Sequence, residues 1–127
     1  MSCDIVFSDK TIQRCNEYMI LATIRMKIEM KMFDEILQTL KSMTGDTYLQ
    51  RGCLSSRLYR DEKENAVFMV EDIWDNEEDL ERYLRSEDYR RILLVLEMAC
   101  EQPDIKFQTI SNQAGLEVVE KARGCKR

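Results

Sequence analysis

The spacing of apolar side chains changes in steps along the chain, and each step predicts a new element of secondary structure. Residues 18–28 begin as an apolar run and then alternate between apolar and polar side chains, which is typical of a strand with one buried face. From Met32 the spacing becomes helical, with an apolar stripe of Phe33, Ile36, Leu37, Leu40 and Met43. We predict that this helix ends at residues 44–46, where Gly45 can adopt the left-handed conformation of a C-terminal cap.

A hairpin of two strands is predicted next. Residues 53–59 alternate in polarity, which places Leu54, Ser56 and Leu58 on one face and Cys53, Ser55, Arg57 and Tyr59 on the other. The polar residues 60–65 then form the hairpin loop, and residues 66–74 form the partner strand, which ends in Trp74.

Two helices are predicted after the hairpin. Asn76 is suited to cap the first, because three carboxylates follow it in the first turn, at the positive end of the helix dipole. The apolar stripe of this helix consists of Leu80, Tyr83 and Leu84. Ser86 is suited to cap the second helix, which we expect to run to about Cys100. Since that helix is apolar almost all round, we expect it to be covered on more than one side.

A last strand at residues 104–111 completes the order of elements, after Pro103 has closed the helical region. Without its two ends the chain reads β-α-β-β-α-α-β, with two long crossovers around a hairpin. This order predicts the α+β class, as a ferredoxin-like βαββαβ domain with a four-stranded antiparallel sheet. The helices cover one face of such a sheet, so we expect a second copy of the chain to cover the other, sheet against sheet.

The two ends of the chain lie outside this repeat. We predict one domain at residues 18–111, preceded at residues 1–17 by an arm or an extra strand. Residues 112–127 form a C-terminal tail that contains a short helix, for which Leu116 and Val119 are the expected anchors.

The segment from Glu71 to Ser86 carries the most specific pattern. It is an acidic strand that ends in Trp74, then a capped, acidic helix start, then Leu-x-x-Tyr-Leu-x-Ser. This pattern resembles the signature of the antibiotic biosynthesis monooxygenase superfamily, and residues 52–54 and 103–105 are similar to the same family. The resemblance covers about residues 18–111. It implies a dimeric α+β barrel in which two four-stranded sheets face each other.

The resemblance also implies an activity. Enzymes of this family include cofactor-free oxygenases of quinols and hydroxylated polycyclic aromatics, in which the substrate anion reduces oxygen directly and the protein supplies shape, desolvation and a hydrogen bond. A second branch degrades haem with an Asn-Trp-His set. The chain contains no histidine, so we expect no haem degradation.

The missing histidine leaves two functions open. Many quinol-type members carry histidine at the position that Tyr83 occupies here. One hypothesis is a cofactor-independent monooxygenase that acts on a small quinol or phenol with O2. The alternative is a non-enzymatic homodimer that binds a small aromatic ligand or helps protein partners to assemble.

Three aromatic residues and one arginine are the candidate site. We predict Tyr83 as the catalytic residue, and Trp74, Tyr89 and Arg25 as substrate-binding residues. Each aromatic side chain also has an ordinary packing interpretation, because large rings bury apolar area wherever they lie.

The acidic residues near Trp74 are open to more than one interpretation. Arg25 can hold a substrate anion or form an ion pair with Glu71 or Asp72 of the neighbouring strand. The same two carboxylates are a conceivable general base, or simply an exposed acidic strand end.

Composition removes several other functions. The net charge of −5 and the scattered basic residues argue against nucleic-acid binding. No apolar stretch approaches the ~20 residues that span a membrane, and the first residues lack a secretory signal, so we expect a cytoplasmic protein. Five widely spaced cysteines without a C-x-x-C pair indicate free thiols rather than a disulfide framework. We expect neither a metal nor a cofactor.

Overall fold

The computed structural model describes residues 18–124, and the predicted arm at residues 1–17 lies outside the described residues. A short 3-10 turn, Met30–Met32, precedes the first helix. The strands and helices are β1 (Met19–Lys27), α1 (Phe33–Tyr48), β2 (Cys53–Arg60), β3 (Val67–Trp74), α2 (Glu77–Leu84), α3 (Glu87–Leu96), β4 (Asp104–Ile110) and α4 (Leu116–Ala122).

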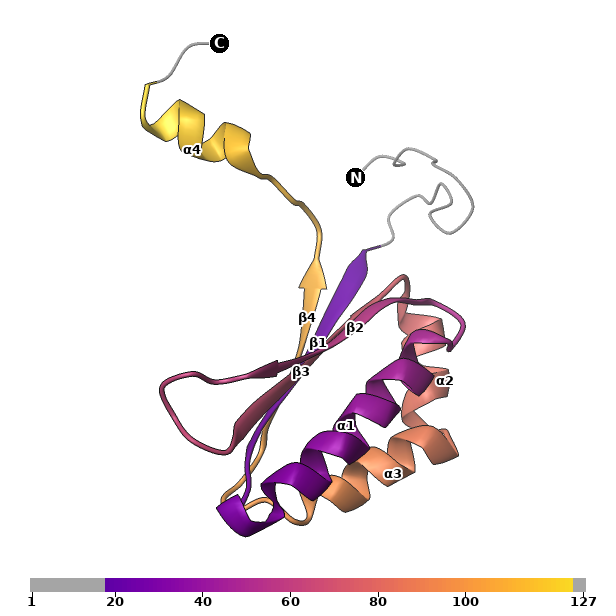
Figure 1. Cartoon of the computed structure of the whole chain (residues 1–127). Helices are drawn as coiled ribbons and strands as arrows, with labels where there is room; N and C mark the ends of the chain where they lie inside the picture. The colour runs from indigo at the N-terminus through magenta and orange to yellow at the C-terminus, as the bar shows by residue number, and fades with distance from the viewer. Residues whose placement is uncertain (1–17, 125–127) are drawn as a thin grey trace.

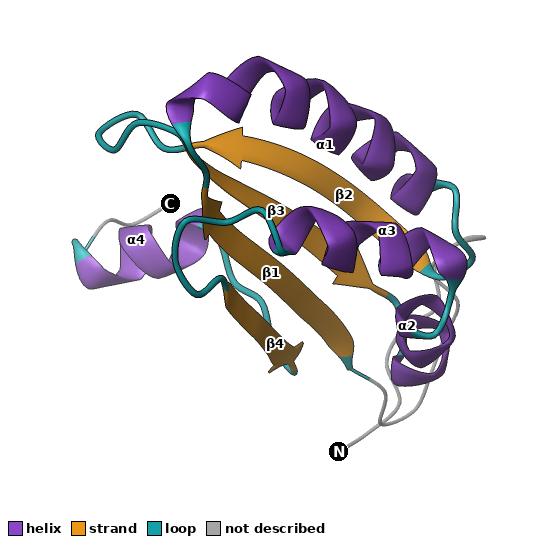
Figure 2. Cartoon of the chain, turned by 90° about the horizontal axis from the view of Figure 1, so that it is seen from below, coloured by secondary structure: helices purple, strands orange, loops and turns teal. Residues whose placement is uncertain are grey.

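The four strands form one antiparallel sheet in the order β2-β3-β1-β4. Helices α1, α2 and α3 all lie on one face of this sheet (Figure 1), and α1 and α3 run side by side across it (Figure 2). This is the predicted α+β, ferredoxin-like fold. Within residues 18–124 no helix covers the opposite face, and none is long and apolar enough to cross a membrane.

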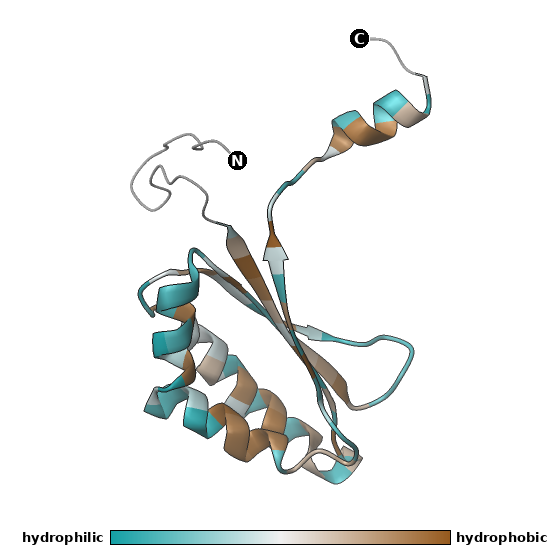
Figure 3. Ribbon diagram, turned by 180° about the vertical axis from the view of Figure 1, so that it is seen from behind, coloured by the Kyte–Doolittle hydropathy of each residue, from teal (hydrophilic) through white to brown (hydrophobic). Residues whose placement is uncertain are grey.

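The core lies between the sheet and the helices. Alternate residues of β1 and β3 point toward α1 and α3 and lose almost all solvent contact; among them are Ile24, Met26, Phe68 and Val70. Hydrophobic residues are found along the strands and along the helices that cover them (Figure 3). A smaller cluster of Ile20, Cys53, Trp74, Leu80 and Tyr83 fills the end of the layer nearest α2.

Both predicted helix caps are confirmed. The side chain of Asn76 accepts a hydrogen bond from the backbone N–H of Asp79, and the side chain of Ser86 accepts one from Tyr89. These caps satisfy backbone donors that have no partner inside the helix. They also fix where α2 and α3 begin.

The predicted end of α1 was wrong. The helix continues through Gly45 to Tyr48, because its last turn is held by tertiary contact: Thr47 is buried and bonded to the side chain of Tyr83. The left-handed glycine lies later, at Gly52, which has φ 88° and precedes β2. Local propensity gave way to packing at this point.

Two helices that we expected to be covered are partly exposed in the single chain, so these expectations stay predictions. Helix α3 ends at Leu96, and Leu93, Leu94 and Met98 are exposed, so the described chain covers only one side of it. The predicted short C-terminal helix is present as α4. However, it projects from the sheet (Figure 1), and its expected anchors Leu116 and Val119 are 64% and 50% exposed.

Candidate functional site

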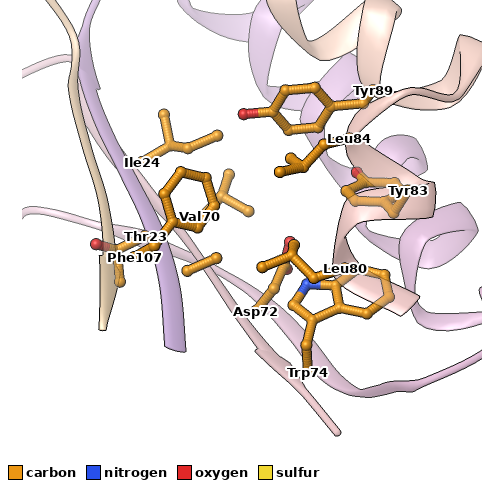
Figure 4. Close-up of a pocket in the computed structure, with 11 residues that line it drawn as sticks. Thr23, Ile24, Val70, Asp72, Trp74, Leu80, Tyr83, Leu84, Tyr89 and Phe107 are labelled. Atoms are coloured by element: carbon orange, nitrogen blue, oxygen red, sulfur yellow. The ribbon is translucent and has the colours of Figure 1, made fainter. Parts of the chain in front are cut away.

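A cavity opens between the sheet and the α2–α3 pair (Figure 4). Residues of β1, β3 and β4 form its floor, and residues of α2 and α3 form its roof. Its side-chain lining includes Ala22, Val70, Asp72, Trp74, Leu80, Tyr83, Leu84, Tyr89 and Phe107. Three of the four predicted site residues, Trp74, Tyr83 and Tyr89, therefore lie together.

The three aromatic rings are in mutual contact. The ring centroids of Trp74 and Tyr83 are 4.9 Å apart in a stacked arrangement, and those of Tyr83 and Tyr89 are 5.3 Å apart, edge to face. Both geometries are favoured for aromatic pairs. The hydroxyl of Tyr89 points across the cavity (Figure 4). The three rings form an apolar wall, and the hydroxyl oxygen of Tyr89 is a polar atom at the edge of this wall.

The hydroxyl of Tyr83 is already in use. It lies 2.8 Å from Oγ1 of Thr47 on α1, and that Oγ1 in turn donates to the backbone carbonyl of Met43 at 2.9 Å. Because the only hydroxyl proton of Thr47 goes to Met43, Tyr83 is the donor to Thr47. Burial raises the pKa of Tyr83 well above its ordinary value of 10. The catalytic role of Tyr83 remains a prediction.

Trp74 presents a polar atom with no partner. Its side chain is 0% exposed, and the indole nitrogen lies on the edge of the ring that is turned toward the cavity (Figure 4). Among the side chains of residues 18–124, Nε1 of Trp74 is the one buried nitrogen or oxygen without a hydrogen bond. Buried polar groups are normally paired, so this N–H is an available donor.

Asp72 is a buried carboxylate in the same wall. It is 7% exposed, and Oγ of Ser56, its register partner on β2, donates a hydrogen bond of 2.6 Å to Oδ1. Burial raises the pKa of Asp72 from 3.8 to about 6; the Ser56 hydrogen bond opposes this shift and the charge of Glu71 adds to it.

The interpretation of Asp72 as part of an exposed acidic strand end is therefore wrong. Asp72 was considered only as a conceivable general base and was not among the four predicted site residues. Its position two residues before Trp74, on the same face of a strand, was the signal that could have placed it there.

Arg25 does not line this cavity. It lies on the other side of β1, opposite Met69, and its guanidinium contacts Asp61 at 3.3 Å and Glu64 at 3.2 Å. The ion pair that we expected with Glu71 or Asp72 was wrong in its partners, because the register brings Arg25 to the β2–β3 loop instead. Its substrate-binding role stays a prediction without a contact to the cavity.

The cavity is narrow, and a wide hollow on the surface lies beside it. Only about 10 Å³ of the inner space is open to the centre of a water molecule, which is room for roughly one water. Beside it lies an open hollow of about 450 Å³ that Glu77 and Glu81 help to line. The same three side chains, Leu80, Leu84 and Phe107, border both spaces and separate them.

The described residues offer no grouping of three or more Cys, Asp or Glu side chains that could bind a metal ion.

Comparison with known proteins places this chain in a family. The chain matches the family described as antibiotic biosynthesis monooxygenase over residues 19–93, which is more than half of its 127 residues. The chain belongs to this family. No curated protein matches it in sequence.

Solved structures with the same fold are distant in sequence. An antibiotic biosynthesis monooxygenase is 17% identical, with a TM-score of 0.64 over 70% of this chain and 95% of that one. A conserved protein of unknown function from Bacteroides thetaiotaomicron is 16% identical, with a TM-score of 0.68 over 74% and 99% of the two chains. A conserved protein from Methanosarcina mazei is 18% identical, with a TM-score of 0.67 over 72% and 92%.

Proposed function

We propose that the chain is a homodimeric, cofactor-independent monooxygenase that oxidises a small quinol or phenolic aromatic with O2. The observation that carries the proposal is the cavity of Figure 4, where three contacting aromatic rings surround a buried carboxylate. Aromatic rings of this kind fit a flat aromatic substrate. A substrate anion that the apolar wall shields from water also reacts with O2 more readily than a hydrated one. Family membership supports the same reaction class.

A hydroxylated anthrone illustrates the balance of the reaction. Loss of a proton gives an anion that transfers one electron to O2, and the resulting carbon radical and superoxide join to form a carbon–oxygen bond. The peroxide anion formed in this way takes back the proton lost in the first step, and loss of water from the resulting hydroperoxide breaks the O–O bond and leaves a carbonyl group. One oxygen atom enters the product, the other becomes water, and the substrate supplies all four electrons.

Entry of a ring into the cavity requires movement at its border. Phe107 is 47% exposed on the edge strand β4, and it separates the narrow inner space from the outer hollow. An exposed side chain at a sheet edge changes rotamer at little cost. We propose that Phe107 and Leu84 turn aside when an aromatic substrate passes from the outer hollow to Trp74.

The test is oxygen uptake by the purified, metal-free protein with a panel of reduced quinones and hydroxylated anthrones. Uptake above the autoxidation blank, with one O2 consumed per product and no hydrogen peroxide, is the expected result. Hydrogen peroxide as product would identify an oxidase instead. No uptake with any compound would contradict the enzyme and leave the binding module.

The binding module is the second candidate, and two observations favour it. The free space is narrow, and the hydroxyl of Tyr83 is bonded to Thr47 rather than directed at a ligand. A module of this kind would bind the same reduced compounds under anaerobic conditions and would leave their autoxidation rate unchanged in air.

Tyr83→Phe separates the predicted catalytic role of Tyr83 from a supporting role. We expect oxygen uptake within about threefold of the wild type and a loss of about 1 kcal/mol in the free energy of unfolding, since one neutral hydrogen bond disappears. Thr47→Val, which removes the partner of the same bond, is the matched control. If Tyr83→Phe lowers turnover about a hundredfold and Thr47→Val does not, the hydroxyl itself takes part in catalysis.

The homodimer is proposed from the bare face of the sheet. Leu21 and Ile73 are register partners on that face, and each is only half-buried in the single chain. A second copy packed sheet against sheet would remove both from water, as in the dimeric barrel that the family resemblance implies.

Ile73→Asp is expected to convert the dimer into a monomer, as measured by light scattering after size-exclusion chromatography at micromolar concentration. The new carboxylate would have to be buried without a partner in the interface. Leu93→Asp on the exposed flank of α3 is the control and should remain dimeric. A wild-type chain that elutes as a monomer, or a dimer broken only by Leu93→Asp, would contradict this interface.

A further inference from the structure

Asp72 and Trp74 place a proton acceptor and a hydrogen-bond donor on one wall of the cavity. They are two residues apart on β3, so their side chains leave the same face of the strand at points about 6–7 Å apart. Both line the cavity, and Figure 4 shows the carboxylate and the indole nitrogen on the side of β3 that faces it. The pair is a matched set of complementary polar groups in an otherwise largely apolar enclosure.

The donor of this pair has no partner within the described chain. Nε1 of Trp74 is buried and makes no hydrogen bond, while the two other polar groups deep in the layer, those of Tyr83 and Thr47, satisfy each other. Packing of the Trp74 ring against Leu80 and Tyr83 does not by itself require the indole nitrogen to face the cavity. A ligand oxygen in the cavity would satisfy this N–H.

The acceptor has spare capacity as well. Ser56 donates to Oδ1 of Asp72, which leaves Oδ2 and further lone pairs for another donor. No arginine or lysine of residues 18–124 pairs with this carboxylate, and the charged residue that acts on it is Glu71, which makes it harder to ionise. A buried carboxylate without a cation accepts a proton from a ligand more readily than an exposed one does.

The spacing of the two groups limits what they can bind together. The hydrogen bond accepted by Asp72 and the one donated by Trp74 each span about 2.7–3 Å. The two ligand atoms that take part in them therefore have to be close to each other. Two oxygens on adjacent ring carbons give each group an oxygen of its own, whereas a single phenolic oxygen would have to donate to Asp72 and accept from Trp74 at the same time. The aromatic walls of Trp74, Tyr83 and Tyr89 suit a flat ring that carries such a pair.

We propose that Asp72 and the indole N–H of Trp74 together bind an aromatic ring with two adjacent oxygens, as in a catechol or an ortho-hydroxy ketone. The hydroxyl O–H bond of the ligand breaks, its proton moves to Oδ2 of Asp72, and the ligand keeps the electron pair as an anion. Nε1 of Trp74 donates to the neighbouring oxygen. This inference rests on the proposed function, for which it names the substrate class and the proton acceptor.

The experiment compares three ligands that differ only at the oxygens. 4-Methylcatechol, 4-methylphenol and 3,4-dimethoxytoluene are titrated into the full chain without oxygen, with calorimetry as the readout. Fluorescence of Trp74, the only tryptophan of the chain, reports whether the ligand reaches the cavity. We expect 4-methylcatechol to bind about tenfold more tightly than either analogue, since each analogue loses one hydrogen bond or the proton transfer.

Three variants assign the preference to the two residues. Asp72→Asn should lose at least about tenfold in affinity for 4-methylcatechol and should abolish the ultraviolet absorbance of the bound catecholate. Trp74→Phe should lose about fivefold for the catechol and little for 4-methylphenol. Asp104→Asn, which changes an exposed carboxylate at the start of β4 that does not line the cavity, is the matched control and should bind as the wild type does. Circular dichroism confirms that each variant is folded.

The outcomes separate this inference from the proposed function. Equal affinity for all three ligands, or a preference that survives in Asp72→Asn, overturns the pairing of Asp72 with Trp74 even if oxygen uptake is found. A catechol preference that depends on both residues, in a chain that consumes no oxygen with any compound, supports the pairing and removes the oxygenase.

Discussion

Asp72→Asn is expected to stabilise the folded chain at pH 8 by about 2 kcal/mol. In the fold, burial raises the pKa of this carboxyl from 3.8 to about 6, so the unfolded chain releases the proton at a lower pH than the folded chain does. Above pH 6 the fold holds a charge that the unfolded state solvates better. At about 1.4 kcal/mol per pKa unit, the penalty is about 3 kcal/mol, and loss of the charge-assisted part of the Ser56 hydrogen bond offsets some of the gain.

The stabilisation should depend on pH in one direction. The folded chain binds more protons at Asp72 than the unfolded chain does between about pH 4 and pH 6. The contribution of Asp72 to stability therefore falls as the pH rises through that range and then stays low. Below about pH 4 the carboxyl is protonated in both states, and the difference between wild type and Asp72→Asn should vanish.

The measurement is urea unfolding of both proteins at several pH values from 4 to 8. Taking the difference between the two proteins removes the contributions of the other carboxylates, provided that Glu71, whose charge acts on Asp72, is unchanged. Tyr83 and Tyr89, which face Asp72 from α2 and α3, stay neutral over this range because burial raises the pKa of each. Stability curves that run parallel, or a variant that is weaker at pH 8, would contradict a buried ionised carboxylate.

A substitution that strengthens the fold and removes ligand binding would separate the two roles of Asp72. A carboxylate that pairs neighbouring strands through Ser56 could be replaced by asparagine without loss of the pairing. A carboxylate that accepts a ligand proton could not be replaced by asparagine without loss of ligand binding. Residues kept at a cost to stability are typical of binding and catalytic sites.

The order of the elements could be predicted because it depends on local signals. Apolar periodicity identified the strands and helices, and the side chains of Asn76 and Ser86 identified where two helices begin. The split βαβ topology follows from that order and the lengths of its connections. Trp74 and Tyr83 could be grouped because Tyr83 lies on the apolar stripe of the helix that follows the strand ended by Trp74, whereas Tyr89 belongs to the next helix.

The details of the site could not be predicted, because they depend on contacts between distant parts of the chain. The register shift between Cys53 and Ser55 places Cys53 beside Trp74 on the helix-facing side, although strict alternation puts it on the face opposite Ser56. The hydroxyl of Tyr83 bonds to a residue 36 positions away. Arg25 pairs with the β2–β3 loop, and the spacing of apolar residues does not predict the path of a loop.

Gly45 and Gly52 show the same contrast between what local sequence predicts and what packing decides. Gly45 was the predicted helix end, and packing decides that the left-handed glycine lies at Gly52 instead. Helix α1 passes through Gly45, while Gly52 takes the left-handed conformation and lets the chain pass under the start of α2. The roles of the two residues could be assigned only once the position of Asp79 was known.

Gly52→Ala is therefore expected to destabilise the chain by about 2–5 kcal/mol, the largest effect of a single methyl group at any glycine of residues 18–124. The φ of 88° costs an L-residue about 1–2 kcal/mol. An added Cβ would also lie 2.3 Å from Oδ2 and 2.4 Å from Cβ of Asp79, and overpacking of this kind costs about 1–3 kcal/mol more.

Asp79 cannot easily move away from that methyl group. It is buried, and it accepts hydrogen bonds from Nδ2 of Asn76 at 2.9 Å and from Arg82 at 2.8 Å. These contacts hold the first turn of α2, the helix that brings Leu80 and Tyr83 to the cavity. A shift of Asp79 would displace that turn, so the emission of Trp74 should change together with the stability.

Gly45→Ala is the matched control, because it adds the same atom where nothing lies within 4 Å. Inside α1 an alanine is favoured over glycine by about 0.5–1 kcal/mol, so this variant should be slightly more stable than the wild type. Urea unfolding of both variants at one pH gives the comparison. A Gly52→Ala chain as stable as Gly45→Ala would mean that the first turn of α2 yields freely, and that the roof of the cavity is held from α3 alone.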